Sequence, residues 1–264
     1  LIDPQYIVDT TGQTAQHPAN TFIPDSMSDG NGNLFKQNTD SYTFPDAEAV
    51  GYYDPSQDAY EDNLVEAIVL LKSAGFEFDE NNMLSADTPL QFTYLTNEGE
   101  GNEAIGAAIQ QDLAVIGAQV DIATEAWSVF LNDRKAGNYD VARQGWLADF
   151  DDPINMLEMW TSGSGNNDSQ FGRPAGSTEP GPAPSYAPQN WTEYDNLIAQ
   201  IKSETDLTAR VAEMHKAEDM LMETYALVPL YYYNDPYMQK SNVTGVYTNP
   251  SGYKYFMFAS KTAA

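Results

Sequence analysis

The stretch Asn138-Tyr-Asp-Val-Ala-Arg-Gln-Gly-Trp-Leu-Ala-Asp-Phe-Asp-Asp-Pro153 holds the most informative pattern in the chain. It predicts a strand over 139–147 that runs out into an acidic, aromatic turn, with a buried core of Tyr139, Val141, Gly145, Trp146 and Leu147. One cation, Arg143, lies inside this strand, and one carboxylate, Asp149, follows its end. A cation, an indole and an anion at one strand end suit a zwitterionic ligand. A core strand with a salt-bridged arginine and a capping aspartate explains the same residues equally well.

Regular elements alternate along the chain before this stretch. Apolar spacing predicts helices over about 61–74, 102–116 and 127–136, each followed by a glycine. Alternating apolar residues predict strands near 90–94 and 120–122. This order is typical of an α/β layer, in which helices cover both faces of a sheet and ligands gather at the carboxyl ends of the strands. Asp149 follows such an end, and that placement favours a binding role.

The second half of the chain is more irregular. Amphipathic spacing predicts helices over about 191–201 and 207–221, and His215 on the second of them is expected at the surface. Ala226–Tyr233 is predicted as a strong strand, with Pro229 marking an edge or a bulge. The aromatic tail over 243–258 is strand-like. The Pro/Gly-rich stretch 172–188 is too long for a routine connection; it suits a lid, a partner surface or a neutral insertion, of which we favour the neutral insertion.

Composition excludes several classes of function. The 264 residues include no cysteine, and 39 acidic against 12 basic residues give a formal charge of −27. Such a surface argues against nucleic acid and against anionic membranes as partners. The first residues of a calcium loop are suggested by Asp29-Gly-Asn-Gly-Asn33, but Leu34 stands where that loop needs glycine. We therefore expect a plain turn there, and no metal, no cofactor and no catalytic motif in the chain.

The chain resembles the extracellular solute-binding proteins of the oligopeptide and dipeptide ABC importers. The resemblance is carried by the block Trp127–Pro153, by Gly165-Asn-Asn-Asp168, by the strand Leu227–Tyr233 and by the opening Leu1–Val8. It implies an α/β lobe of the type II periplasmic-binding kind, with a mixed sheet and helices on both faces. It also implies residues 1–233 as the second lobe, and 234–264 as C-terminal strands that return toward a first lobe absent from this chain.

The resemblance implies a set of ligand-binding residues. Asp149 would hold the α-ammonium group of a peptide, and Arg143 would meet the C-terminal carboxylate of short peptides. The backbone of Gly145 and Leu147 would pair with the peptide as an added strand. The indoles of Trp127 and Trp146 would line side-chain pockets, and Asn97 and Asn166 would place polar groups near the ligand. A core role for each tryptophan, a turn role for each asparagine and a structural ion pair for Arg143 stay open. The full set is Asp149, Arg143, Gly145, Trp146, Leu147, Trp127, Asn97 and Asn166.

The resemblance also implies partners and a location. The expected function is capture of oligopeptides between two lobes and delivery to the permease subunits of an ABC importer, with no reaction catalysed. The same fold binding an oligosaccharide, a nickel complex or haem is the alternative. We expect an exported protein, extracellular or periplasmic, anchored to the membrane through a lipidated N-terminus that this chain lacks. One lobe offers half a site, so the chain alone should bind its ligand weakly or not at all.

Overall fold

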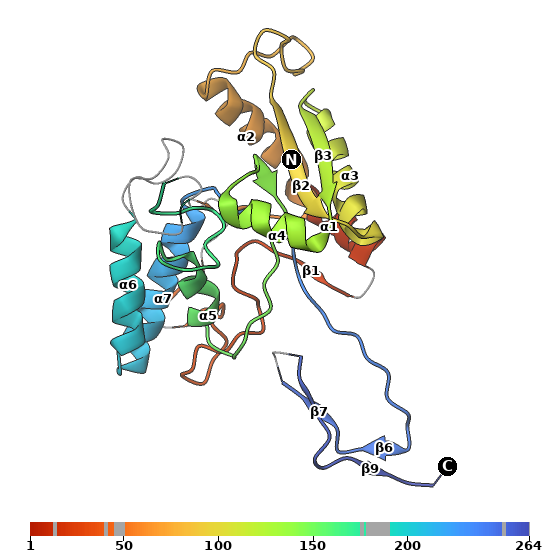
Figure 1. The fold of residues 1–264 in the computed structure, drawn as a ribbon, viewed down its shortest axis with the longest axis vertical. Coiled ribbons are helices and arrows are strands. Elements are labelled where there is room, and N and C mark those ends of the chain that lie inside the picture. Colours follow the sequence, from red (N-terminus) through yellow and green to blue (C-terminus); the bar gives the residue numbers. More distant parts are fainter. Residues whose placement is uncertain are drawn as a thin grey trace.

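The computed structural model describes residues 1–12, 15–39, 42–44, 51–174, 177, 191–249 and 252–263. Most of the Pro/Gly-rich stretch 172–188 therefore lies outside the described residues. One half of the molecule is built on a three-stranded parallel sheet in the order β3-β2-β4, formed by β2 (Gln91–Asn97), β3 (Gln119–Glu125) and β4 (Val141–Ala142). Figure 1 shows this sheet between α2 (Tyr60–Ser73) and α3 (Glu100–Ala114).

Both faces of the sheet are covered. Neighbouring residues of a strand point to opposite faces, and Tyr94 and Leu95 of β2 are both buried. On one face, Tyr94 and Val120 pack with Ile105 and Ile109 of α3. Helix α2 contributes Ile68 to a second apolar cluster at the end of α3. The helices predicted over 61–74, 102–116 and 127–136 and the strands predicted near 90–94 and 120–122 are confirmed. Among the described residues, antiparallel pairing occurs only outside this sheet.

Helix α4 (Trp127–Ala136) connects β3 to β4. It ends where Gly137 adopts the left-handed conformation, with φ 73°, and donates its N–H to the carbonyls of Asp133 and Arg134. Glycine reaches this conformation without the steric cost that a Cβ atom brings. The chain then reverses direction and enters β4 beside β2.

Two predicted strands are much shorter than expected. The strand predicted over 139–147 pairs only at Val141 and Ala142, and the strand predicted over 226–233 pairs only as β5 (Tyr231–Tyr232) with β1 (His17–Pro18). The buried core predicted for 139–147 was also wrong, because Val141 and Leu147 are exposed. The physical reason is that the chain leaves the sheet after β4, so the alternation of a strand no longer decides which side chains are buried.

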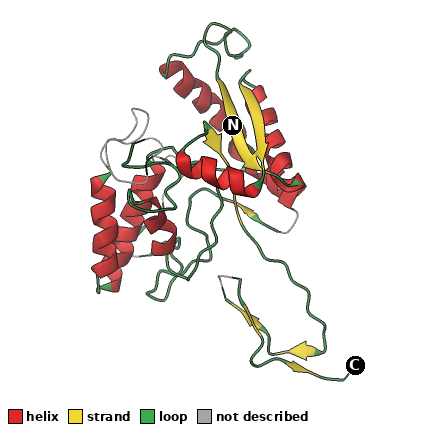
Figure 2. Ribbon diagram, in the orientation of Figure 1, coloured by secondary structure: helices red, strands yellow, loops and turns green. Residues whose placement is uncertain are grey.

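Helices make up the other half of the molecule. They are α5 (Ile154–Leu157), the short 3-10 turn Glu158–Trp160, α6 (Thr192–Ser203) and α7 (Leu207–Met222), and Figure 2 shows the three α-helices side by side, apart from the sheet. Their shared core includes Trp160, Tyr194 and Leu221, and the irregular segment 22–35 closes it. Asp206 caps α7 by accepting the N–H groups of Thr208 and Ala209. Short helical turns also occur at Pro4–Ile7 (α1), Val8–Gly12 and Gln57–Ala59.

Helix α7 buries two titratable side chains. The prediction that His215 lies at the surface was wrong: it is buried, and its ring stacks between Phe35 and Tyr42. Burial lowers the pKa of His215 to about 4. One turn further on, Glu218 is fully buried, and burial raises its pKa to about 7. Sequence spacing on α7 does not reveal this burial, because the segment that covers the helix is irregular and lies far away in the chain.

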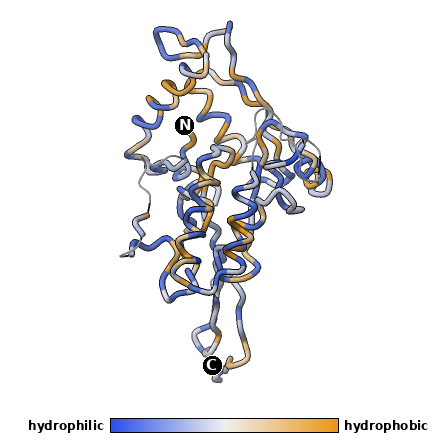
Figure 3. The backbone as a smooth tube through the Cα atoms, turned by 90° about the vertical axis from the view of Figure 1, so that its left-hand side faces the viewer, coloured by the Kyte–Doolittle hydropathy of each residue, from blue (hydrophilic) through white to orange (hydrophobic). Residues whose placement is uncertain are grey.

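The C-terminal tail stands away from the rest of the molecule. Figure 1 and Figure 3 show it from two directions as an extended arm that leaves the body after β5. It contains two short antiparallel pairs, β6 (Val243–Thr244) with β9 (Ser260–Lys261), and β7 (Tyr247–Thr248) with β8 (Lys254–Tyr255). Met238, Phe256, Met257 and Phe258 are all exposed on this arm. The strand-like character predicted for the tail is confirmed, although its apolar side chains contribute to no core within the described residues.

Candidate functional site

The chain leaves the sheet after β4 and runs irregularly from Arg143 to Asp149; we call residues 143–149 the exit segment. Its last sheet bond is donated by the N–H of Arg143 to the carbonyl of Leu95, at 2.9 Å. Within the described part of the chain, the backbone groups of residues 144–148 make no hydrogen bond. Buried backbone groups are almost always paired, so an unpaired run of this length needs either water or an added partner. An extended segment of another molecule can supply that partner.

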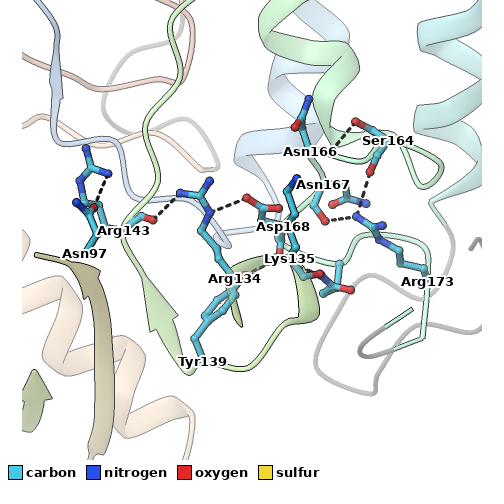
Figure 4. A network of polar contacts seen from close by, with 11 residues as sticks. Asn97, Arg134, Lys135, Tyr139, Arg143, Ser164, Asn166, Asn167, Asp168 and Arg173 are labelled. Carbon is cyan, nitrogen blue, oxygen red and sulfur yellow. Dashed lines mark hydrogen bonds and ion pairs between the residues drawn. The ribbon is translucent and has the colours of Figure 1, made fainter. Parts of the chain in front are cut away.

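Arg143 lies at the first end of the exit segment and is held from two sides. Its Nη1 donates to Oδ1 of Asn97 at 3.1 Å, and its Nη2 donates to the hydroxyl of Tyr233 at 3.2 Å. Asn97 is the last residue of β2, and Tyr233 follows β5. Two residues that the sequence analysis selected, Arg143 and Asn97, are therefore in direct contact (Figure 4).

Gly145 has a packing reason to be glycine. A Cβ atom built on it would collide with the hydroxyl of Tyr233, and it would lie 3.4 Å from Cζ of the same ring. The missing side chain thus makes room for the tyrosine that contacts Arg143. Packing against Tyr233 therefore explains the glycine, and the backbone of Gly145 stays unpaired within the described residues.

A buried ion pair fixes the position from which the exit segment starts. Nε of Arg134 lies 2.6 Å from Oδ2 of Asp168, and Nη1 of Arg134 donates to the carbonyl of Arg143 at 3.1 Å. The hydroxyl of Tyr139 donates to the carbonyl of Asp168 at 2.6 Å. Figure 4 shows this network between the Asn97–Arg143 contact and the loop 164–168. Burial raises the pKa of Asp168, and the Arg134 guanidinium opposes that rise.

Three carboxylates lie at the second end of the exit segment, and they differ in their partners. Oδ1 and Oδ2 of Asp152 accept both terminal nitrogens of Arg210, at 3.0 and 2.8 Å, and Oδ1 also accepts the N–H of Ile154. Oδ1 of Asp151 accepts the N–H of Ser28 at 2.9 Å. Asp149 is exposed and forms no ion pair with a described residue. Asp152 is thus neutralised by Arg210, whereas Asp149 carries a charge that no described cation pairs and accepts the uncharged amide of Asn155 at 3.4 Å.

The two tryptophans of the predicted set differ in environment. Trp127 opens α4 and is 50% exposed, with its ring 5.8 Å from that of Phe130. Trp146 is half-buried against the helical core, and its indole N–H donates to Oδ1 of Asn155 at 3.0 Å. The side chain of Leu147 is 73% exposed. The exit segment thus carries one half-buried and one exposed apolar side chain, those of Trp146 and Leu147.

No contact within the described part of the chain brings Asn166 to the other predicted residues. It is exposed, and its N–H donates to Oγ of Ser164 at 3.2 Å. Its neighbour Asn167 is buried and bonds to the backbone of Phe171 in both directions. The turn role of Asn166 is visible in the structure, and its contact with a ligand stays a prediction.

Asp29 forms the turn that the sequence analysis expected. Its Oδ1 accepts the N–H groups of Asn31 and Asn33, and its Oδ2 accepts the side-chain amide of Asn33. The described residues contain no group of three or more histidine, cysteine or acidic side chains that could hold a metal ion. In the same residues, no helix has the length and apolar character needed to cross a membrane.

Three residues at the exit segment were not selected from the sequence. Tyr233 belongs to a strand that was noted without a role, and Arg134 is a basic residue in the last turn of a helix, which usually indicates only favourable helix electrostatics. Asn155 is the second residue of α5, whose N-cap is Pro153. No sequence signal separates these positions from ordinary ones, because each acquires its contact through a residue on another element.

Comparison with known proteins identifies the family. The family model described as "Bacterial extracellular solute-binding proteins, family 5 Middle" matches residues 1–168. The dipeptide-binding protein DppE of Bacillus subtilis is 29% identical over 261 residues, which is 98% of this chain and 40% of that protein. The chain thus spans well under half the length of this curated relative.

Two solved structures share the fold. The murein tripeptide binding protein MppA of Escherichia coli aligns with a TM-score of 0.67 at 25% identity, over 92% of this chain and 40% of that one. Haemophilus influenzae OppA in complex with the peptide RPPGFSPFR aligns with a TM-score of 0.65 at 25% identity, over the same shares. These likenesses confirm the predicted fold class, an α/β lobe of the type II periplasmic-binding kind. With the family model matching more than half of its residues, the chain belongs to the bacterial extracellular solute-binding proteins of family 5.

Proposed function

We propose that this chain is the peptide-capturing lobe of a solute-binding protein that serves an ABC importer. The observation that carries the proposal is the exit segment. An available carboxylate, Asp149, and a positioned guanidinium, Arg143, flank five residues whose backbone is unpaired within the described part of the chain. A peptide carries the complementary ammonium group, carboxylate and backbone, so it pairs with this segment as an added strand.

Each predicted residue has a role in this proposal. Asp149 accepts the α-ammonium group, and Arg143 binds the C-terminal carboxylate of short peptides by charge-assisted hydrogen bonds. The backbone of Gly145 and Leu147 pairs with the peptide main chain. Trp127 and Trp146 line pockets for its side chains. Asn97 orients Arg143, and Asn166 approaches a longer ligand from the loop 164–168.

The proposal extends to the rest of the protein. Residues 1–233 form the second lobe, and 234–264 return toward a first lobe outside this chain, which would cover the apolar side chains exposed on the tail. The ligand binds between the lobes and shifts an equilibrium from open to closed, because both lobes contact it. The closed protein delivers the peptide to permease subunits without chemical change. A lipid anchor on a preceding segment holds it at the membrane, and mass spectrometry of the mature N-terminus tests that point.

A substitution at Asp149 tests the proposed function. In the full-length protein, Asp149→Asn removes the charge that pairs with the ammonium group and keeps the shape of the side chain. We expect affinity for a free tri- to hexapeptide to fall roughly 10- to 100-fold, as for the loss of a hydrogen bond to a charged group. Asp151→Asn is the matched control, because Asn can still accept the N–H of Ser28, and its affinity should stay within about threefold. Equal losses for the two variants would contradict the ammonium role of Asp149.

The alternative ligand classes have a separate outcome. An oligosaccharide, a nickel complex or haem lacks an α-ammonium group, so its binding needs no anion at Asp149. Binding of one of these ligands to the full-length protein, with no binding of peptides, would replace the peptide proposal.

A further inference from the structure

Asn155 joins the indole and the carboxylate of the exit segment. This side chain is 4% exposed and lies in α5, beneath the second end of the segment. Its Oδ1 accepts the indole N–H of Trp146 and the backbone N–H of Asp149, both at 3.0 Å. Its Nδ2 lies 3.4 Å from Oδ2 of Asp149. One buried amide thus contacts Trp146 once and Asp149 twice.

The orientation of this amide follows from its partners. Trp146 Nε1 and the backbone nitrogen of Asp149 can only donate, so the side-chain oxygen of Asn155 has to face them. The NH2 group is then directed at the carboxylate of Asp149, which can only accept when it is ionised. A buried amide without such partners would be costly, and here its oxygen and one of its N–H groups are used. The arrangement sets the distance between the Trp146 ring and the Asp149 carboxylate.

We propose that Asn155 is the positioning residue of the ammonium site, which it builds by holding the Asp149 carboxylate at a fixed position relative to Trp146. The inference rests on the proposed function, since it assigns the support of the same site. Asn155 contacts no ligand; it acts through Asp149. Its removal leaves the Trp146 and Asp149 N–H groups without their acceptor and releases the carboxylate from its fixed direction.

A double-mutant cycle in the full-length protein separates positioning from a general structural role. The probe is the peptide that the wild type retains most strongly from a tri- to hexapeptide pool, titrated with a free and with an acetylated N-terminus. Asn155→Ala should weaken binding of the free peptide roughly tenfold and reduce the ratio of free to acetylated affinity toward one. In an Asp149→Asn background the same substitution should cost less than about threefold, because its target is already neutral.

Two further variants control for folding and for geometry. Asn63→Ala removes an amide of α2 that donates to the carbonyl of Asp54, away from the exit segment, and should leave the affinity ratio unchanged. Asn155→Asp keeps the acceptor for both N–H groups and sets an oxygen against Oδ2 of Asp149. Two carboxylates this close repel each other when both are charged, so the ratio should change with pH, whereas the wild-type ratio should not follow that change.

The outcomes divide cleanly between the two proposals. A wild type that does not distinguish free from acetylated peptide overturns the ammonium site and the role of Asn155 together. A wild type that distinguishes them, with a ratio that Asn155→Ala or Asn155→Asp leaves unchanged, overturns the positioning role alone. Equal costs of Asn155→Ala in both backgrounds also overturn it, since a merely structural residue gives that result.

Discussion

Replacing Glu218 by glutamine should change how the stability of the chain depends on pH. Glu218 is fully buried in α7, and its Oε1 accepts the N–H of Ile23 at 3.1 Å. Its Oε2 has no hydrogen-bond partner among the described residues. Burial raises the pKa of Glu218 to about 7, although the nearby Lys36 ammonium opposes the rise. Glutamine keeps the shape and the acceptor for Ile23 but carries no charge at any pH.

The sign and size of the effect follow from the two pKa values. The unfolded chain releases this proton near pH 4.5, and the folded chain holds it until about pH 7. The folded state therefore binds more protons between these values, and stability falls as the pH rises through this window. At 1.36 kcal/mol for each tenfold change in proton affinity, the full loss is about 3 kcal/mol. Glu218→Gln avoids this loss, so it should match the wild type at pH 4.5 and exceed its free energy of unfolding by about 3 kcal/mol at pH 8.

Urea denaturation of the chain at pH 4.5, 6 and 8 measures this difference. His215 contributes a slope of opposite sign, because its folded pKa of about 4 lies below the ordinary 6.5. That slope is common to both proteins and cancels in the difference. Glu223→Gln, an exposed change just past the end of α7, is the control and should stay within about 0.5 kcal/mol at every pH. A difference for Glu218→Gln that is the same at all three pH values would refute the burial argument.

Other substitutions test the contacts around the exit segment and the completeness of the site. Gly145→Ala should weaken peptide binding by the full-length protein roughly tenfold, because the added Cβ displaces the Tyr233 hydroxyl. Adding Tyr233→Phe to the same chain should recover part of that loss, and no recovery would argue against this clash. Arg134→Met leaves Asp168 buried without its cation and should cost about 3–5 kcal/mol in urea denaturation, most of which Asp168→Leu should restore in the double variant. The chain by itself should bind peptides weakly or not at all in calorimetry, and submicromolar binding would contradict the two-lobe account.

The sequence was sufficient for elements whose pattern is local. The helices around Ile68, Ile109 and Phe130 follow from apolar spacing and terminal glycines, and the strands around Tyr94 and Val120 follow from alternation. Each of these signals depends on residues within one element. The same reasoning overestimated the strands at 139–147 and 226–233. Apolar residues continue there after the hydrogen-bonded partner has ended, and only the partner decides how long a strand is.

The candidate site was predictable in its residues but not in its contacts. Asp149 was selected by its place after a predicted strand end, Arg143 by its place inside that strand, and both by family resemblance. The structure adds that Asp151 and Asp152 accept hydrogen bonds from Ser28 and Arg210. Asn155 and Tyr233 could not be selected. Each meets the exit segment from a different element, and a single sequence does not show which distant side chains meet.

The most direct test of the peptide account is a calorimetric titration of the full-length protein with both lobes present. The ligand is a mixed pool of tri- to hexapeptides, used first with free N-termini and then after N-acetylation. Acetylation removes the positive charge that Asp149 is proposed to bind, so the account predicts binding of the free pool and a loss of at least about tenfold for the acetylated pool. Equal binding of the two pools would remove Asp149 as the ammonium site, and binding of neither would contradict peptide capture itself.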